Sequence, residues 1–396
     1  MTAVRSYGSV CSGAGTCAMA LHPLGWRTAW FSEIEPAPSV LLAHHWPRVP
    51  NLGDMTALPE RIRSGEIAAP DLLVGGTPCQ SFSAAGNRGS LTDTRGNLTL
   101  TFCEIADAID AQRAPDHGCW MLWENVPGVL STSDDAFGCL LGRLAGAGTE
   151  LHHPSGRWPH AGVVDGPGRC IAWRILDAQH FGLAQRRRRV FALVGPRGAA
   201  VHPAQVLFES AGLPGDPAPS REPRQGAAAA ARARAARRRH AGVIAPPLAR
   251  CVTTGEGRRQ DWETTTLIAQ PAITFDYAAS ARFHMQIDEE LAGTLLKGKP
   301  LGVAQDDGAE RPMAVRKITP RECERLMGWP DDHTLIPHGD GHLADAHRYH
   351  ICGNGWALPC VSWILSRLTA ALTAADASAA RIARPGGTTI TSPEIP

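Results

Sequence analysis

A cysteine in an unusual loop is the first residue of this sequence that suggests chemistry. Cys79 lies in GGTPCQSFS (75–83), directly after the apolar run 71–75. If that run is a buried strand, Cys79 lies at its carboxyl edge, where open α/β sheets bind their ligands. The thiolate is the reactive form of cysteine, and loop amides or nearby cations favour it by lowering the pKa of a thiol. We therefore predict a nucleophile at Cys79; the alternative is a structural thiol.

A glutamate ends another apolar run. In WENVPG (123–128), Glu124 and Asn125 follow hydrophobic residues that predict a buried strand. Trp123 and Val126 give the carboxyl group apolar neighbours, and such surroundings raise the pKa of a carboxyl group so that it can donate a proton. The sequence predicts a general acid at Glu124, with a helix-capping turn as the alternative.

Four consecutive arginines begin a third apolar run, in QRRRRVF (185–191). Alternation along a strand puts Arg187 and Arg189 on one face and Arg186 and Arg188 on the other. A solvated strand end is the alternative, but it explains poorly why the charges run directly into an apolar stretch. We expect one of the two faces to reach the catalytic edge.

A glycine-rich turn follows the first predicted strand, in CSGAGT (11–16). Gly13 and Gly15 allow the backbone to approach a ligand where a helix begins. Glu33 ends the second predicted strand, about 20 residues further on, where an acidic residue can bind ribose hydroxyls. Asp54 is expected at the end of a third strand. These residues indicate an adenosine-containing cofactor; a tight turn with exposed acids is the alternative.

The elements that would position these groups alternate along the first half of the chain. A short helix is predicted at 16–24. Strands are predicted at 7–11, 28–33, 71–75, 119–124, 170–177 and 188–194. Their continuous apolar runs, without clean alternation, are typical of a parallel sheet that helices cover on both faces. The pattern predicts a doubly wound α/β domain.

The pattern changes near residue 205. Residues 214–240 are first rich in proline and glycine and then in alanine and arginine, without an apolar stripe, which predicts a flexible linker or a solvated helix. The helical pattern returns in TPRECERLMGW (319–329), where Thr319 and Glu322 predict a capping box. A second amphipathic helix is predicted at 359–375.

Composition limits the classes of protein. With 396 residues, of which 43% are hydrophobic and 19% charged, the chain can bury a core and is not disordered as a whole. We find no apolar stretch near the ~20 residues of a membrane helix and no secretory signal at the N-terminus. The net charge of +1 does not by itself indicate a nucleic-acid-binding protein. Eleven cysteines without zinc-ligand spacing predict mostly buried thiols in a reducing cytosol and no bound metal.

The ordered set of motifs resembles the DNA (cytosine-5)-methyltransferase family, which uses S-adenosyl-L-methionine. The resemblance covers 7–200 and 316–365. It rests on these segments, in chain order: VCSGAG (10–15), PCQ (78–80), DTRGNL (93–98), ENV (124–126), Q-x-R-x-R (185–189), RKITPRECERLMGWP (316–330) and GNGWALP (353–359). Three positions depart from the family pattern: Cys11 stands for phenylalanine, Thr16 for glycine and Trp356 for valine.

The resemblance implies a doubly wound, Rossmann-like α/β methyltransferase sheet with a smaller, mostly β or irregular target-recognition domain. The implied catalytic residues are Cys79, Glu124, Arg187 and Arg189. The implied cofactor-binding residues are Cys11, Ser12, Gly13, Gly15, Glu33, Ile34, Asp54, Met55, Pro78, Leu100, Asn354 and Gly355. The implied substrate-binding residues are Gln80, Ser81, Ser83, Asn125, Val126 and Gln185. The implied divisions are a catalytic domain at 1–205 that resumes at 316–380, a target-recognition domain at 206–315 with a flexible linker at 214–240, and a disordered tail at 381–396.

The resemblance also implies the reaction. Cytosine C5 is a poor nucleophile until a thiolate adds at C6, so Cys79 would form a covalent adduct there. Glu124 would stabilise or protonate N3, and Arg189, helped by Arg187, would hold O2 of the base. The target base must leave the duplex to be reached. The implied partners are double-stranded DNA and S-adenosylmethionine, without a membrane, for a monomeric, cytoplasmic protein of bacterial or phage origin.

Three other functions stay open on the sequence alone. An RNA cytosine-5 methyltransferase acting on tRNA shares the chemistry, but the segment 206–315 favours DNA, whose sequence readout needs a recognition lobe. A nicotinamide-dependent oxidoreductase explains the glycine turn and Glu33 but gives no use to the PCQ and ENV motifs. A non-catalytic DNA-binding protein would not need Cys79, Glu124 and Arg189 together.

Overall fold

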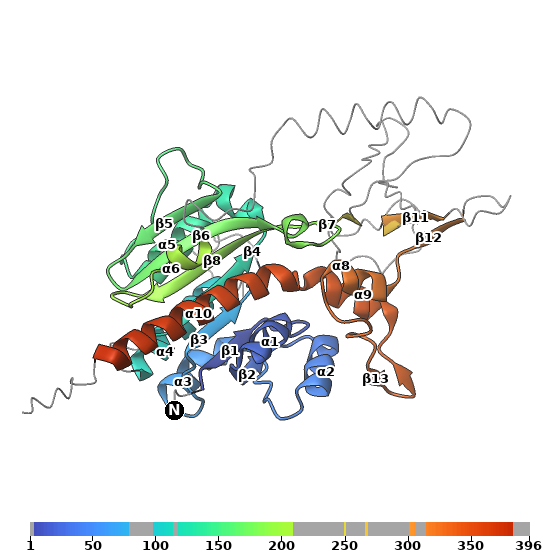
Figure 1. Cartoon of the computed structure of the whole chain (residues 1–396), viewed down its shortest axis with the longest axis horizontal. Coiled ribbons are helices and arrows are strands. Elements are labelled where there is room, and N and C mark those ends of the chain that lie inside the picture. The colour runs from blue at the N-terminus through green and yellow to red at the C-terminus, as the bar shows by residue number, and fades with distance from the viewer. Residues whose placement is uncertain are drawn as a thin grey trace, which may run out of the picture.

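A seven-stranded sheet forms the centre of the protein (Figure 1). The computed structural model describes residues 4–78, 98–113, 118–208, 249–250, 266–267, 301–305 and 314–382. The strand order is β2-β1-β3-β4-β8-β6-β5. The strands are β1 (Ser6–Val10), β2 (Arg27–Ser32), β3 (Leu72–Gly75), β4 (Trp120–Asn125), β5 (Ala161–Asp165), β6 (Arg169–Asp177) and β8 (Arg188–Pro196).

The sheet is parallel in one half and antiparallel in the other. Strands β2, β1, β3 and β4 pair in parallel, whereas β8, β6 and β5 are each antiparallel to their neighbours. The six predicted strands are confirmed to within a few residues. The prediction of a parallel sheet is wrong for β6 and β8, because these two strands are joined by a segment too short for a parallel crossover. Strand β5, which was not predicted, is short and exposed at alternate residues.

Helices cover both faces of the sheet, as predicted (Figure 1). Helices α3, α4 and α5 pack on one face, and α1, α6 and α10 pack on the other. Alternate residues of β4 enter the two cores, with Met121 and Trp123 in the first and Leu122 in the second. The helices are α1 (Thr16–Leu21), α2 (Pro36–His45), α3 (Leu58–Arg63), α4 (Leu98–Gln112), α5 (Ala136–Ala145), α6 (Pro203–Leu207), α8 (Pro320–Leu326), α9 (Asp345–Asn354) and α10 (Leu358–Ile382).

The third strand expected before Asp54 does not form. Asn51 makes only an isolated bridge with Phe31. Asp54 instead caps the 3-10 helix η2 (Met55–Ala57), where its carboxylate accepts a hydrogen bond from the backbone N–H of Thr56 at 2.9 Å. The expectation is corrected because a local side-chain cap competes with strand pairing at this acidic residue.

Helices α8 and α9 form a third core against the glycine turn and α2. Helix α8 begins with the predicted capping box: Thr319 Oγ1 accepts from the Glu322 N–H, and the Glu322 carboxylate accepts from the Thr319 N–H. The ring of His333 donates to the carbonyl of Ala14 at 2.9 Å. This contact joins the chain after α8 to the turn that follows β1.

Helix α10 runs along the sheet (Figure 1) and is longer than the predicted 359–375. Among the described helices it is the only one long and apolar enough to span a membrane, over Leu358–Arg381, by length and composition alone. The expectation that no apolar stretch approaches the length of a membrane helix is therefore wrong for this segment. One face of α10 packs on the sheet core through Cys360, Val361, Ile364, Leu365 and Leu368.

Most of the predicted target-recognition domain lies outside the described residues, as do the linker 214–240 and residues 383–396. The short strand β7 (Gln185–Arg186) pairs with β9 (Ala249–Arg250). A three-stranded sheet is formed by β10 (Thr266–Leu267), β11 (Leu301–Gln305) and β12 (Ala314–Lys317), and a hairpin by β13 (Pro337–His338) and β14 (Gly341–His342). The domain boundaries stay predictions.

Candidate active site

The glycine turn after β1 has the backbone conformation of a ligand-binding loop. Cys11, Gly13 and Gly15 have positive φ angles of 48°, 53° and 71°. A side chain at Gly15 would also collide with Trp46, because its Cβ would lie 2.2 Å from the indole ring. The N–H of Gly13 donates to Glu33 Oε2 at 2.8 Å, so the carboxylate at the end of β2 holds the turn.

An open pocket with about 310 Å³ of empty space lies at the carboxyl ends of β1 and β3. Its lining comprises Ser9, Val10, Cys11, Ser12, Gly13, Ala14, Thr16, Cys17, Val74, Gly75, Asn354, Gly355 and Trp356. Five of the predicted cofactor-binding residues are among them: Cys11, Ser12, Gly13, Asn354 and Gly355. The fold thus brings the first and last motifs of the sequence together at one pocket.

Four other predicted cofactor residues lie beside the turn rather than in the lining. Glu33 accepts hydrogen bonds from the backbone of Gly13 and Glu35, and its pKa is raised because burial outweighs these bonds. Ile34 is 69% exposed, and Asp54 is also exposed. Met55 is buried, with its sulfur 3.9 Å from Cys11 Sγ.

The remaining three predicted cofactor residues have other surroundings. Gly15 belongs to the turn but not to the pocket lining. Leu100 is half-buried against the sheet core on α4, and Pro78 is exposed at the last described position before Cys79.

An ion pair between a buried carboxylate and a partly buried guanidinium lies at the end of β4. Glu124 is 7% exposed, and its Oε1 lies 3.1 Å from Arg189 Nε on β8. The two strands are antiparallel neighbours, so the carboxylate and the guanidinium meet at one edge of the sheet. Burial raises the pKa of Glu124 above its ordinary value, against the opposing effect of Arg189 and Arg187. A carboxyl group with a raised pKa can hold a proton for donation.

The side chain of Arg187 binds backbone carbonyls of the GNG segment. Its side chain is buried, and Nη2 donates to the carbonyls of Gly353 and Gly355 at 3.1 and 2.6 Å. Its own N–H donates to Asp177 at 3.0 Å. This geometry fits a residue that holds the GNG segment at the pocket. The catalytic role expected for Arg187 stays a prediction.

Thr77 joins the end of β3 to β4 and α4, two residues before Cys79. Its hydroxyl accepts from the Trp123 indole at 2.9 Å and shares a hydrogen bond with the Thr99 hydroxyl at 2.8 Å. Its carbonyl accepts from Asn125 Nδ2 at 3.0 Å. Thr77 was not predicted from the sequence; the signal for it was a hydroxyl residue directly before the Pro-Cys pair.

Asn125 therefore binds the loop that leads to Cys79, and this contact accounts for its side chain in the structure. Val126, next along the chain, is 43% exposed at the same edge. Gln185 is fully buried and donates to the carbonyl of Leu326 at 2.6 Å, which connects β7 to α8. A direct contact between Gln185 and a substrate does not fit this burial.

Gly76 lies between the pocket and the ion pair. A Cβ at this glycine would come within 2.9 Å of Trp356 Nε1 and 3.2 Å of Glu124 Oε2. The indole also packs edge-on against Phe191, with ring centroids 6.0 Å apart. Trp356, which stands where the family pattern has valine, therefore places a large ring near the Glu124 carboxylate. The sequence alone could not reveal this.

Four predicted residues lie outside the described part of the chain: Cys79, Gln80, Ser81 and Ser83. Their predicted roles are untested by the structure. The described neighbours on either side, Thr77 and Thr99, are hydrogen-bonded to each other. Thr77 also accepts a hydrogen bond from Asn125 through its carbonyl.

Comparison with known proteins agrees with this geometry. The family model of the C-5 cytosine-specific DNA methylases matches residues 6–201. The chain is 31% identical over 194 residues to the type II methyltransferase M.AquIA of Picosynechococcus sp., covering 48% of this chain and 71% of that protein. The crystal structure of S. pombe Dnmt2 methyltransferase superposes with a TM-score of 0.57 at 16% identity, over 93% of this chain and 99% of that one.

A further relative is named for a different activity. The DNA N-6-adenine-methyltransferase of Escherichia phage P1 is 38% identical over 468 residues, which cover 92% of this chain but only 61% of that protein. This chain therefore spans about three fifths of the phage protein. This chain is identified as a methyltransferase by the family match and by the M.AquIA relative, and the shared fold agrees. The nicotinamide-dependent oxidoreductase is thereby excluded. The chain belongs to the C-5 cytosine-specific DNA methylase family.

Proposed function

We propose that this protein transfers a methyl group from S-adenosylmethionine to C5 of a cytosine that has been flipped out of duplex DNA. Cys79 is the nucleophile, Glu124 acts at N3 of the base and Arg189 holds the carboxylate and the O2 edge. The natural setting is a bacterial or phage modification system, in keeping with relatives that are type II and orphan methyltransferases. The observation that carries the proposal is the Glu124–Arg189 ion pair beside the loop that leads to Cys79.

The pocket after β1 fits the cofactor. Its lining is largely loop backbone and small side chains, and the positive φ angles of Cys11 and Gly13 turn that backbone around the empty space. Residues Ser12, Gly13, Asn354 and Gly355 would hold the cofactor there. When bound, S-adenosylmethionine supplies an electrophilic methyl group. Arg187 keeps the Gly353 and Gly355 carbonyls in place at this pocket and is a positioning residue.

The electron flow follows from the chemistry of cytosine. The Cys79 thiolate would add to C6, which makes the electron pair of the C5–C6 double bond available at C5. C5 would take the methyl group as its bond to the sulfonium sulfur breaks, and S-adenosylhomocysteine would be the leaving group. The C5 proton then leaves to a base, the double bond re-forms and the Cys79 thiolate is expelled. The raised pKa of Glu124 favours its protonated form, which can donate a hydrogen bond or a proton to N3 as Cys79 adds.

Methyl transfer from labelled S-adenosylmethionine to a DNA duplex tests the assignment of residues. We expect Cys79→Ser to abolish transfer, and Glu124→Gln to reduce it by about 10²–10⁴-fold, the range of general acid–base catalysis. Thermal unfolding of each variant with and without cofactor is the control, because both substitutions should leave the cofactor pocket intact. Substantial turnover by Cys79→Ser would contradict the role of the nucleophile.

Adenine N6 is the second candidate, because the phage P1 relative is named for that activity. An exocyclic amine attacks a methyl donor directly, so adenine methylation has no use for a thiolate that adds to a ring. Separation of nucleosides from a methylated duplex distinguishes 5-methylcytosine from N6-methyladenine.

An RNA substrate is tested in the same assay. Duplex DNA and tRNA, each supplied with labelled cofactor, should differ strongly in acceptance if the segment 206–315 reads DNA. A non-catalytic DNA-binding protein would transfer no label to either. Duplex DNA containing 5-fluorocytosine separates these outcomes, because the missing C5 proton prevents release and only an active Cys79 leaves a covalent adduct.

A further inference from the structure

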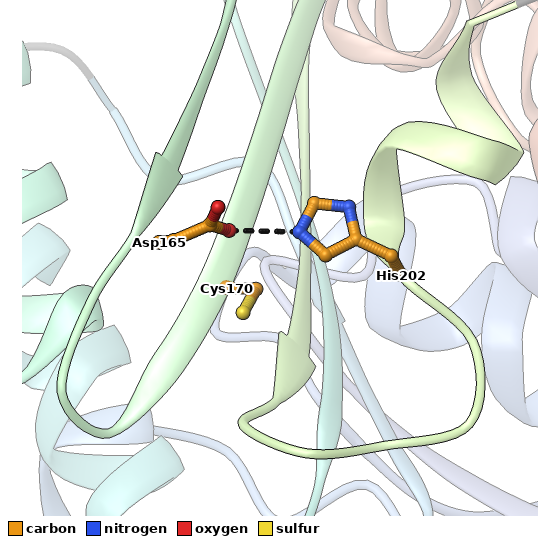
Figure 2. Close-up of side chains that lie close together, drawn as sticks. All are labelled: Asp165, Cys170 and His202. Carbon is orange, nitrogen blue, oxygen red and sulfur yellow. Dashed lines mark hydrogen bonds and ion pairs between the residues drawn. The ribbon is translucent and has the colours of Figure 1, made fainter.

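A group of metal-ligating side chains lies far from the proposed active site. Asp165, Cys170 and His202 each offer one donor atom, and the three donor atoms lie within 4.8 Å of one another (Figure 2). Within the described part of the chain this is the only such group of three. The spacing of these three residues in the sequence matches no metal motif, so the sequence does not predict this group.

The fold explains why these residues meet. Asp165 ends β5 and is the direct cross-strand partner of Cys170 on β6. Directly opposed residues of an antiparallel pair project from the same face of the sheet. His202 reaches this face from the turn before α6, a helix that packs on the sheet core. Its Nε2 lies 2.8 Å from Asp165 Oδ1 (Figure 2).

The register of the sheet puts this group at the opposite edge from Glu124. Cys170 pairs with Gly195 near the end of β8, whereas Asn125 pairs with Val190 near its beginning. The group is therefore not part of the proposed catalytic site. A ligand bound there would tie the β5–β6 hairpin to the start of α6 without touching substrate.

We propose that Asp165, Cys170 and His202 form a binding site for a thiophilic divalent cation of the Zn²⁺ class. Carboxylate oxygen, thiolate sulfur and imidazole nitrogen are the three donor types that zinc takes in proteins, whereas Mg²⁺ and Ca²⁺ prefer oxygen alone. Tetrahedral zinc holds such donors about 3.3–3.7 Å apart, so small side-chain rotations convert the observed arrangement into three ligands. The fourth position is left to water.

The structure also indicates what binding must change. His202 Nδ1 accepts a hydrogen bond from the Ala204 N–H at 3.2 Å, so Nε2 carries the ring proton and donates to Asp165. When Nε2 binds the metal, the ring proton moves to Nδ1 and the bond from Ala204 is lost. The Cys170 thiol gives its proton to solvent. The site thus exchanges a helix cap and a His–Asp hydrogen bond for three metal bonds.

Cobalt absorption tests the site on the full chain. Co²⁺ replaces Zn²⁺ in such sites and shows a near-ultraviolet band only when a thiolate is bound. We expect one cobalt ion per chain with this band and with the strong visible bands of tetrahedral cobalt. Addition of Zn²⁺ should remove them and raise the temperature of unfolding. Absence of the thiolate band from the wild-type protein would overturn the proposal.

Three variants connect the band to these residues. Cys170→Ser should lose the thiolate band and the zinc-dependent rise in unfolding temperature. His202→Asn should weaken cobalt binding while the asparagine still caps α6, because asparagine is a good N-cap residue. Cys139→Ala, which removes a thiol on α5, is the matched control and should keep the band. Retention of the band in Cys170→Ser would show that other thiols bind the ion and would overturn the assignment. All three variants should keep methyl transfer, since none lies at the proposed active site.

Discussion

Substitution of Thr77 by valine tests how the loop before Cys79 is held in place. Valine keeps the size of the side chain and removes the hydroxyl. In the wild-type protein this hydroxyl accepts from the Trp123 indole and shares a hydrogen bond with Thr99, all three side chains being buried. Thr77→Val therefore leaves the Trp123 N–H buried without this acceptor and Thr99 without this partner.

The cost in stability follows from those two bonds. A buried donor without an acceptor costs about 1–3 kcal/mol, and a lost neutral hydrogen bond about 1 kcal/mol. We expect the free energy of unfolding of Thr77→Val to fall by about 2–4 kcal/mol on this basis. Urea unfolding followed by tryptophan fluorescence measures it. Thr77→Ser keeps the hydroxyl and is the matched control, with a smaller loss that reflects only its missing methyl group.

The cost in activity follows from position rather than from contact with substrate. Thr77 is two residues before Cys79, and a misplacement of a reacting group by about 1 Å can cost 10²-fold in rate. We expect kcat of Thr77→Val to fall by about 10–100-fold, with little change in KM for the cofactor. Wild-type kcat together with an unchanged urea midpoint in Thr77→Val would refute the reasoning.

Three further substitutions test other parts of the site. Glu124→Gln should remove a pH dependence of stability. Because the pKa of Glu124 is raised in the folded protein, the wild-type protein should lose stability as the pH rises from the ordinary glutamate pKa through the raised one. Urea unfolding measured across this pH range should show the decline in the wild type and not in Glu124→Gln. Burial lowers the pKa of His333 from 6.5 to about 4, so stability on the order of 3 kcal/mol should be lost as the pH falls through that interval. The His333→Gln side chain can still donate a hydrogen bond to the Ala14 carbonyl, and the acid-unfolding curve of this variant should lack that loss. Gly76→Ala should impair methyl transfer because its Cβ would crowd Trp356 and Glu124, and Trp356→Val should restore part of the activity; no recovery in the double variant would contradict the steric explanation.

Much of the fold was predictable because apolar runs mark buried strands. The runs at 71–75 and 119–124 became β3 and β4, the two strands that bring the loop of Cys79 and Glu124 to one edge. The direction of β6 and β8 was not predictable from hydrophobicity, because a fully buried strand has the same composition in either direction. Strand β5 was not predicted because it is short and only its alternate residues are partly buried.

The site was predictable where a motif places a side chain at a strand end, as for Glu124 and Arg189. Alternation along one strand placed Arg187 on the same face as Arg189 and did not predict the hydrogen bonds of its side chain to the Gly353 and Gly355 carbonyls. In the structure the chain at Arg187 separates β7 from β8, with its N–H bound to Asp177. The group of Asp165, Cys170 and His202 was not predictable from the sequence. Its members are brought together by the register of the β5–β6 hairpin and by the turn before α6, not by their spacing in the sequence.

The central claim is that this protein methylates cytosine at C5 through Cys79. The most direct test incubates the purified chain with duplex DNA and S-adenosylmethionine, digests the DNA to nucleosides and identifies the methylated product by mass spectrometry, with Cys79→Ser in parallel. The proposal predicts 5-methyl-2′-deoxycytidine from the wild-type protein and none from the variant. N6-methyl-2′-deoxyadenosine as the product, or 5-methyl-2′-deoxycytidine in equal amount from Cys79→Ser, would contradict it.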